Sequence, residues 1–225
     1  MNLYPFSLLL VAFINFTLGI YIYFRNRKSN LYKIFLGLTT SLGLWCLGTF
    51  FTVLYSGDLN LFGFFERTTF VSGLLISLFF YIFCINFPYK SASSGKYLIS
   101  LYGAIILIYT YVIFFTTWFA QNTISINSYT TLQHNDTWFI CWVIAFLLPL
   151  VAGLLQLFYK FKATDGIYRE YLLTLLLVAA LPILFSLYFD VYLVGLENYQ
   201  YNSISPFSSL LFDFAILRMI LIKRQ

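Results

Sequence analysis

Charged side chains are scarce in this sequence. Of its 225 residues only 9% are Asp, Glu, Lys or Arg, whereas 61% are hydrophobic and 22% are aromatic. Soluble domains carry about 25% charged residues. A water-soluble protein of this length has no means of hiding so much apolar surface. The composition therefore excludes a soluble globular domain and indicates an integral membrane protein.

Histidine and cysteine are also scarce, which restricts the chemistry. His134 is the only histidine, and the cysteines Cys46, Cys84 and Cys141 lie in apolar stretches without a CxxC pair, so no disulfide framework is expected. One histidine cannot supply the ligands of a metal-dependent membrane hydrolase, and none lies in an apolar segment to activate a serine. We therefore predict no enzyme, and neither catalytic residues, metal nor cofactor.

Long apolar runs fill the rest of the sequence. A helix needs about 20 apolar residues to cross a membrane, and barrel strands would alternate in segments of about ten. We predict an all-α fold, an integral membrane seven-helix transmembrane bundle in which residues 1–225 form a single domain. The predicted helices lie near residues 3–24, 31–55, 62–87, 97–119, 137–159, 171–194 and 206–222.

Basic residues predict the orientation of these helices. All of the 13 lysines and arginines except Arg67 follow the first, third, fifth or seventh apolar run, or lie near its end. The positive-inside rule places that side in the cytoplasm. The N-terminus is then outside, the C-terminus is cytoplasmic, and the protein is a multi-pass component of the cell (cytoplasmic or inner) membrane. The net charge of +5 reflects this topology, and no nucleic-acid partner is expected.

The longest predicted outer loop covers residues 120–136. Its TISINSYTTLQ stretch alternates apolar and polar residues on both sides of Asn127 and Ser128, which is compatible with a small hairpin over the bundle. An irregular loop fits the same pattern equally well.

Polar residues at membrane depth are the candidates for function. Asp213 lies near the middle of the last predicted helix, where it must face the bundle interior and find a partner, or stay protonated. Asn15 precedes Arg25 by ten residues and Asp213 precedes Lys223 by ten, so both lie about 15 Å from the inner boundary. If the bundle closes as a ring, the first and last helices are neighbours, and we predict an Asn15–Asp213 contact. A packing hydrogen bond without a signalling role is the alternative.

Four further residues complete the set of ligand-binding or signalling candidates. Glu66 and Arg67 lie near the outer end of the third predicted helix, and Asp190 near the outer end of the sixth. They can rim an outward cavity or simply meet water at the interface. Arg218 lies about 140° around the last helix from Asp213, so it reaches the inner boundary instead.

The last two helices carry motifs of a known kind. FAILRMILI, from Phe214 to Ile222, has a small residue at Ala215, an apolar pair and an arginine at Arg218, and Pro206 stands where that helix begins. The sequence resembles the seven-transmembrane sensory region at the amino terminus of many bacterial histidine kinases and some diguanylate cyclases.

Other positions fit the same pattern. In YREYLLTLLLVAALPILFSLY, Arg169 and Pro182 match the basic residue and the Leu-Pro pair of the sixth helix, and Trp45 matches a tryptophan of the second. The basic cluster RNRK follows the first helix as expected. Ser186 departs from the pattern, since an asparagine is frequent in the family at that position.

The resemblance implies a membrane-embedded receptor or sensory input module. An external or membrane ligand would shift the bundle between two packings, and the last helix would pass the shift to a cytoplasmic effector. Because Gln225 directly follows that helix, we expect the effector outside this chain. The expected partners are the lipid bilayer, an unidentified small ligand, and either a second copy of the chain as a homodimer or a separate kinase. The alternatives are a small multi-pass transporter or solute facilitator, and an assembly factor without a ligand.

Overall fold

Helices account for nearly all of the computed structural model, which describes residues 4–90, 95–126, 129–193, 196 and 204–222. Six helices are long and apolar enough to cross a membrane, and a shorter apolar helix spans Ser205–Leu217. The predicted seven-helix bundle is therefore confirmed. The helices are α1 (Tyr4–Arg25), α2 (Asn30–Leu54), α3 (Leu59–Asn86), α4 (Gly95–Phe115), α5 (Asp136–Lys162), α6 (Ile167–Ser186) and α8 (Ser209–Ile222). A π-helical segment, η1 (Leu187–Tyr192), continues α6, and a 3₁₀ turn, η2 (Ser205–Ser208), precedes α8.

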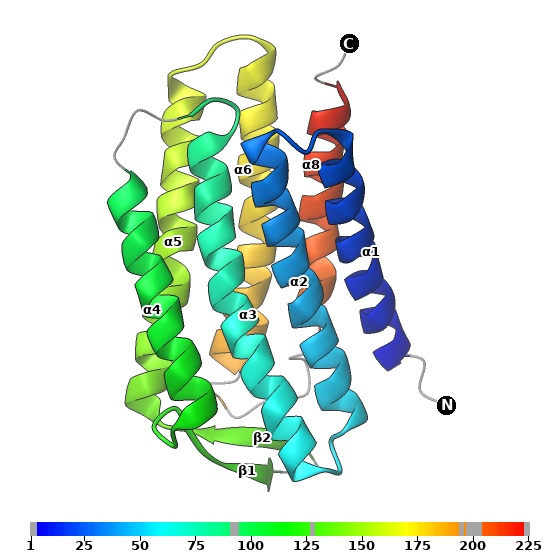
Figure 1. Ribbon diagram of the computed structural model, residues 1–225, viewed down its shortest axis with the longest axis vertical. Coiled ribbons are helices and arrows are strands. Elements are labelled where there is room, and N and C mark those ends of the chain that lie inside the picture. The colour runs from blue at the N-terminus through cyan, green and yellow to red at the C-terminus, as the bar shows by residue number, and fades with distance from the viewer. Residues whose placement is uncertain (1–3, 91–94, 127–128, 194–195, 197–203, 223–225) are drawn as a thin grey trace.

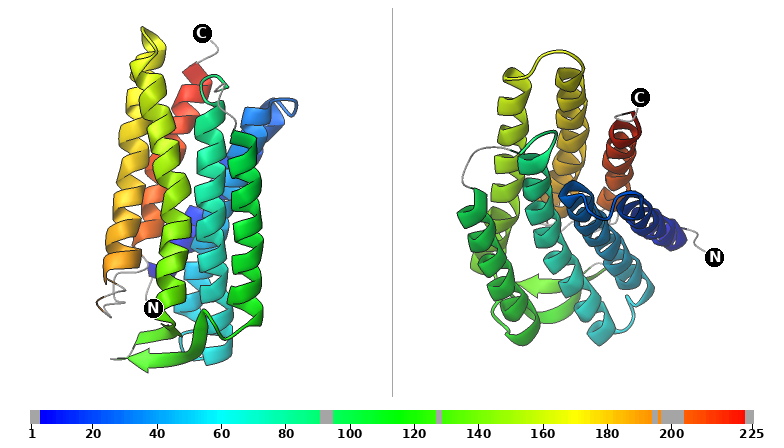
Figure 2. Two further views of the ribbon diagram at one scale, coloured as in Figure 1. Left: turned by 90° about the vertical axis from the view of Figure 1, so that its left-hand side faces the viewer. Right: turned by 45° about the horizontal axis from the view of Figure 1, so that its top comes forward.

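The bundle closes as a ring. Helix α1 packs on α2, α2 on α3, α3 on α5, α5 on α6, α6 on α8, and α8 returns to α1. Helix α4 packs against α3 (Figures 1 and 2). The two chain ends lie at opposite ends of the bundle (Figure 1), as an odd number of crossings requires. Which end faces the cytoplasm stays a prediction from the basic residues.

Side chains at the helix ends explain where the boundaries differ from those predicted. Helix α3 begins three residues before position 62, because the Asp58 carboxylate accepts hydrogen bonds from the amides of Asn60 and Leu61, both at 3.1 Å. Asn135 caps α5 in the same way by accepting from the Trp138 amide at 3.4 Å. Helix α4 ends at Phe115, four residues early, because the chain turns there to enter a strand.

The loop between α4 and α5 is a hairpin. Strands β1 (Ala120–Ile126) and β2 (Tyr129–His134) pair antiparallel, with Ile126 opposite Tyr129 and Ala120 opposite His134. Of the two interpretations of residues 120–136, the structure has the hairpin. Both strands contact α3, and the hairpin crosses one end of the bundle (Figure 1).

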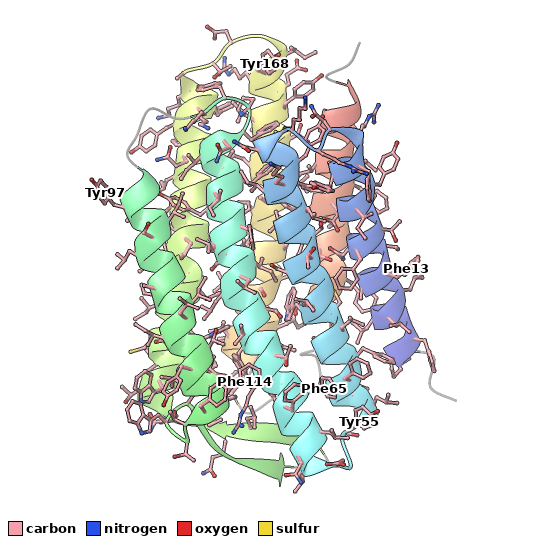
Figure 3. The ribbon with its side chains drawn as sticks, in the orientation of Figure 1. Phe13, Tyr55, Phe65, Tyr97, Phe114 and Tyr168 are labelled. Carbon is pink, nitrogen blue, oxygen red and sulfur yellow. The ribbon has the colours of Figure 1, made fainter. Side chains whose placement is uncertain are left out.

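The outer surface of the bundle is apolar. Phe13 on α1 and Tyr97 on α4 point away from it (Figure 3) and are 67% and 83% exposed. Apolar exposure of this kind recurs along α1, α4, α5 and α6, far beyond what a soluble monomer tolerates. Inside, helices approach closely where side chains are small: a Cβ atom on Gly43 would lie 2.7 Å from the ring of Phe16. The protein is a multi-pass membrane protein.

Candidate functional site

Four polar side chains meet where α1, α2 and α8 come together. Asn15 and Asp213 are fully buried, and so are Cys46 and Ser209. The Asn15 amide nitrogen donates to Val11 O at 2.9 Å and to Ser209 Oγ at 3.3 Å. The Cys46 thiol shares a hydrogen bond with Ser209 and interacts electrostatically with Asp213. We call Asn15, Cys46, Ser209 and Asp213 the α1–α8 cluster.

The hydrogen bond from Asn15 to α8 goes to Ser209, one helical turn before Asp213. Among the described residues, neither carboxyl oxygen of Asp213 has a hydrogen-bond partner, and the same holds for Asn15 Oδ1. Helices α1 and α8 are therefore neighbours, as the ring argument required, and the bond between them uses a serine that the sequence reasoning passed over. A direct contact of Asn15 with Asp213 stays a prediction.

A second polar group lies beneath the hairpin. Glu66 is buried, with 8% of its surface exposed, and it accepts a hydrogen bond from the Leu132 amide of β2. Its second oxygen, Oε2, is inaccessible and has no partner within the described part of the chain. Phe70 follows one turn later on the same face of α3 and packs at 5.0 Å from the ring of His134. We call the following set the hairpin cluster: Glu66, Phe70, Phe119, His134, Phe139 and Trp142.

His134 is the unexpected member of the hairpin cluster. Its ring lies 5.4 Å from Phe119 and 5.2 Å from Phe139, between ring centroids, and its Nδ1 atom is inaccessible and unpartnered. Burial among these rings lowers the pKa of His134 from 6.5 to about 4. The sequence showed only a lone histidine in an outer loop, because the hairpin that folds it inward is a tertiary feature.

Acidification should therefore destabilise this end of the protein. Between pH 6.5 and pH 4 the unfolded chain binds a proton at His134 that the folded chain excludes, so stability falls as pH falls. We expect a loss of about 1–2 kcal/mol in the free energy of unfolding by pH 5. Because the chain has one histidine, His134→Gln removes this contribution entirely. Equal pH dependence of wild type and His134→Gln between pH 6.5 and 5, measured by chemical unfolding, would contradict the prediction.

A stack of aromatic rings leads from the hairpin cluster into the bundle. His134 stacks on Phe139, Phe139 on Trp142, and Trp142 on Phe146, with interplanar angles of 21°, 17° and 4°. The Trp142 indole nitrogen also donates to Phe70 O at 3.2 Å, which fixes α5 against α3. We call His134, Phe139, Trp142 and Phe146 the ring stack.

The opposite end of the α3–α5 contact holds a lysine that the sequence reasoning missed. Lys160 is 5% exposed, and its Nζ donates to four carbonyl oxygens at the end of α3, at 2.7–2.8 Å. In the sequence, Lys160 is one of the basic residues that predict the orientation of the helices. Its spacing from Phe146, Leu150, Gly153 and Leu157 places it on the buried face of α5, and that periodicity is the signal that would have found it. The acceptors are the carbonyls of Cys84, Ile85, Phe87 and Tyr89.

The remaining candidates do not join these clusters. Arg67 follows Glu66 on α3, so its side chain leaves the helix about 100° away. Its Nε is buried and unpartnered. Asp190 lies in η1 and Arg218 in the last turns of α8, but their side chains lie outside the described part of the structure.

Comparison with known protein families gives a match over nearly the whole chain. Residues 7–223 match the model of a family described as the N-terminal 7TM region of histidine kinase. No curated protein matched the chain. The family match covers nearly the whole chain, and it confirms the resemblance drawn from the motifs of the last two helices.

Proposed function

Because the chain belongs to the family of N-terminal seven-transmembrane regions of histidine kinases, we propose that this membrane sensory module binds a small ligand at the hairpin cluster and signals through α8. The N-terminus and the hairpin would face outward in the cell membrane, and the end of α8 would face a cytoplasmic kinase or effector. Residues 1–225 would act as one sensory domain. The observation that carries the proposal is Glu66, a buried carboxyl group with one unpaired oxygen under a hairpin.

The chemistry of the hairpin cluster restricts the ligand class. Glu66 Oε2 has no hydrogen-bond partner among the described residues, and one turn along the same face of α3 the ring of Phe70 meets the rings of His134 and Trp142. Such a site favours a small ligand with an apolar body and a hydrogen-bond donor, which is the usual pattern of a mostly apolar pocket with few polar groups. The hairpin covers it from the end of the bundle, so a ligand from outside would displace the hairpin or slip beneath it.

Continuous packing supports transmission from this site to α8. The ring stack runs along α5 as far as Phe146, which lies against Gly73 of α3. Further along α3, the ring of Phe80 lies 5.7 Å from the ring of Phe212 on α8. A ligand that prefers one packing of α3 and α5 would thereby bias the position of α8, provided that its affinity differs between the two packings.

A ligand screen on the purified chain tests the proposal. We expect compounds of this class to raise the melting temperature by several degrees, because a ligand bound to the folded state stabilises it. Glu66→Gln replaces the carboxyl group by an amide of the same shape, and should weaken binding about tenfold or more, in keeping with the cost of leaving a buried hydrogen-bonding group unpaired. Glu170→Gln, an exposed carboxylate at the far end of the bundle, is the matched control and should bind normally.

Two results would count against this function. Equal affinity in wild type and Glu66→Gln would remove the hairpin cluster as the binding site. Net movement of the ligand into proteoliposomes would favour the transporter alternative, since a receptor binds without moving its ligand across.

A further inference from the structure

The α1–α8 cluster contains three buried oxygen atoms that no donor of the described residues reaches. They are both carboxyl oxygens of Asp213 and the Oδ1 atom of Asn15, and all three are inaccessible. Both side chains are fully buried. An ionised, unpaired carboxylate in an apolar interior costs several kcal/mol, so the Asp213 carboxyl group either carries a proton or pairs with a positive charge. Among the side chains that the structure describes, no lysine or arginine pairs with it.

These polar side chains come from two adjacent helices, since Asn15 of α1 donates to Ser209 of α8 at 3.3 Å. The Asn15 nitrogen is already committed to Val11 O and Ser209 Oγ, which leaves Oδ1 as the free acceptor of that amide. Ser209 and Asp213 are four residues apart on α8, so they share a face with Cβ atoms about 5–6 Å apart. Asn15, Ser209 and Asp213 therefore offer an amide, a hydroxyl and a carboxylate oxygen from two adjacent helices.

The set of acceptors selects the class of ligand. Amide, hydroxyl and carboxylate oxygens are ligands of hard cations. The atoms are closed to solvent, and a monatomic ion needs less space among them than an organic ammonium does. One carboxylate balances one positive charge, so a divalent ion would leave an excess charge in apolar surroundings. A single proton on Asp213 would leave at least one of the three unpaired oxygens without a partner. One metal ion can contact all three oxygens.

We propose that Asn15, Ser209 and Asp213 bind one dehydrated sodium ion between α1 and α8. The bound ion links the first helix to the last one through charge, at a place where the two helices otherwise share the single hydrogen bond from Asn15 to Ser209 among those described. This site lies on different helices from the hairpin cluster and holds whether or not a ligand binds there.

Thermal unfolding of the purified full chain tests the proposal, with sodium chloride exchanged for choline chloride at constant ionic strength. We expect about 150 mM sodium to raise the melting temperature by about 3–5 °C, as for an ion present at roughly ten times its dissociation constant. Asp213→Asn should abolish this shift, and Ser209→Ala should weaken sodium binding about tenfold. Glu170→Gln removes an exposed carboxylate on α6 and should keep the full shift.

Radiolabelled sodium provides a second measurement that does not depend on the fold of a variant. The wild-type chain should bind one ion per molecule, and unlabelled sodium should displace it while choline should not. Equal melting temperatures in sodium and choline would overturn the proposal, and so would a sodium shift that persists in Asp213→Asn. A melting temperature that responds to pH but not to sodium would assign the site to a proton and reject the ion.

Discussion

Replacing Lys160 by methionine should lower the free energy of unfolding by about 3–5 kcal/mol, the loss expected when the partner of several buried acceptors is removed. The ammonium group has three N–H donors and meets four carbonyl oxygens at 2.7–2.8 Å, so at least one N–H is shared. Methionine has a similar length but no donor. The carbonyls at the end of α3 would then lose their partner within the protein, because the last carbonyls of a helix have none in the helix itself.

Lys162→Met is the matched control. Lys162 lies two residues later on α5 and is exposed, so its replacement should cost less than about 0.5 kcal/mol, the usual range for surface substitutions. Chemical or thermal unfolding of both variants in the same detergent measures the difference. Similar losses in the two variants would show that Lys160 does not fasten α5 to α3.

Replacing Phe212 by alanine should destabilise the bundle by about 3–5 kcal/mol, as for other buried aromatic residues. Phe212 is 5% exposed, and its ring lies 5.7 Å from Phe80 and 6.4 Å from Phe83, between centroids. Its loss leaves a cavity between α8 and α3 and removes both ring contacts that the described part of the structure shows between these two helices. Membrane helices associate mainly by packing, so no solvent effect makes up for the contacts that the cavity removes.

Phe214 offers a matched comparison on the same helix. It is 55% exposed on the outer surface, so Phe214→Ala should cost less than about 1 kcal/mol. If α8 carries the signal as proposed, Phe212→Ala should also uncouple ligand binding from any change at the end of α8, which a spin label placed there would report. Equal stability losses at the two positions, or an undiminished response in Phe212→Ala, would contradict this role of Phe212.

Some buried polar groups can be located from the local sequence pattern, and others cannot. Asn15 and Asp213 stood out because a polar side chain within an apolar run must face the interior, whatever the packing. Ser209 did not stand out, because a serine satisfies itself within a helix and reveals nothing of its neighbours. Likewise, Lys160 looked like any basic residue at a helix end until α3 was placed beside it.

The sequence by itself determined the membrane class, the number of helices and the family, because apolar run length and composition act through the bilayer and need no knowledge of packing. The tertiary structure alone decided that residues 120–126 and 129–134 pair as a hairpin over α3, that His134 turns inward, and that Lys160 and Ser209 become the partners of distant groups. These features depend on contacts between elements far apart in the chain. Periodicity in the sequence can show which face of a helix is buried, as it does for Lys160, but it does not show which group lies against that face. The scarcity of charge predicted where the protein resides, while the placement of its few buried charges is a property of the fold.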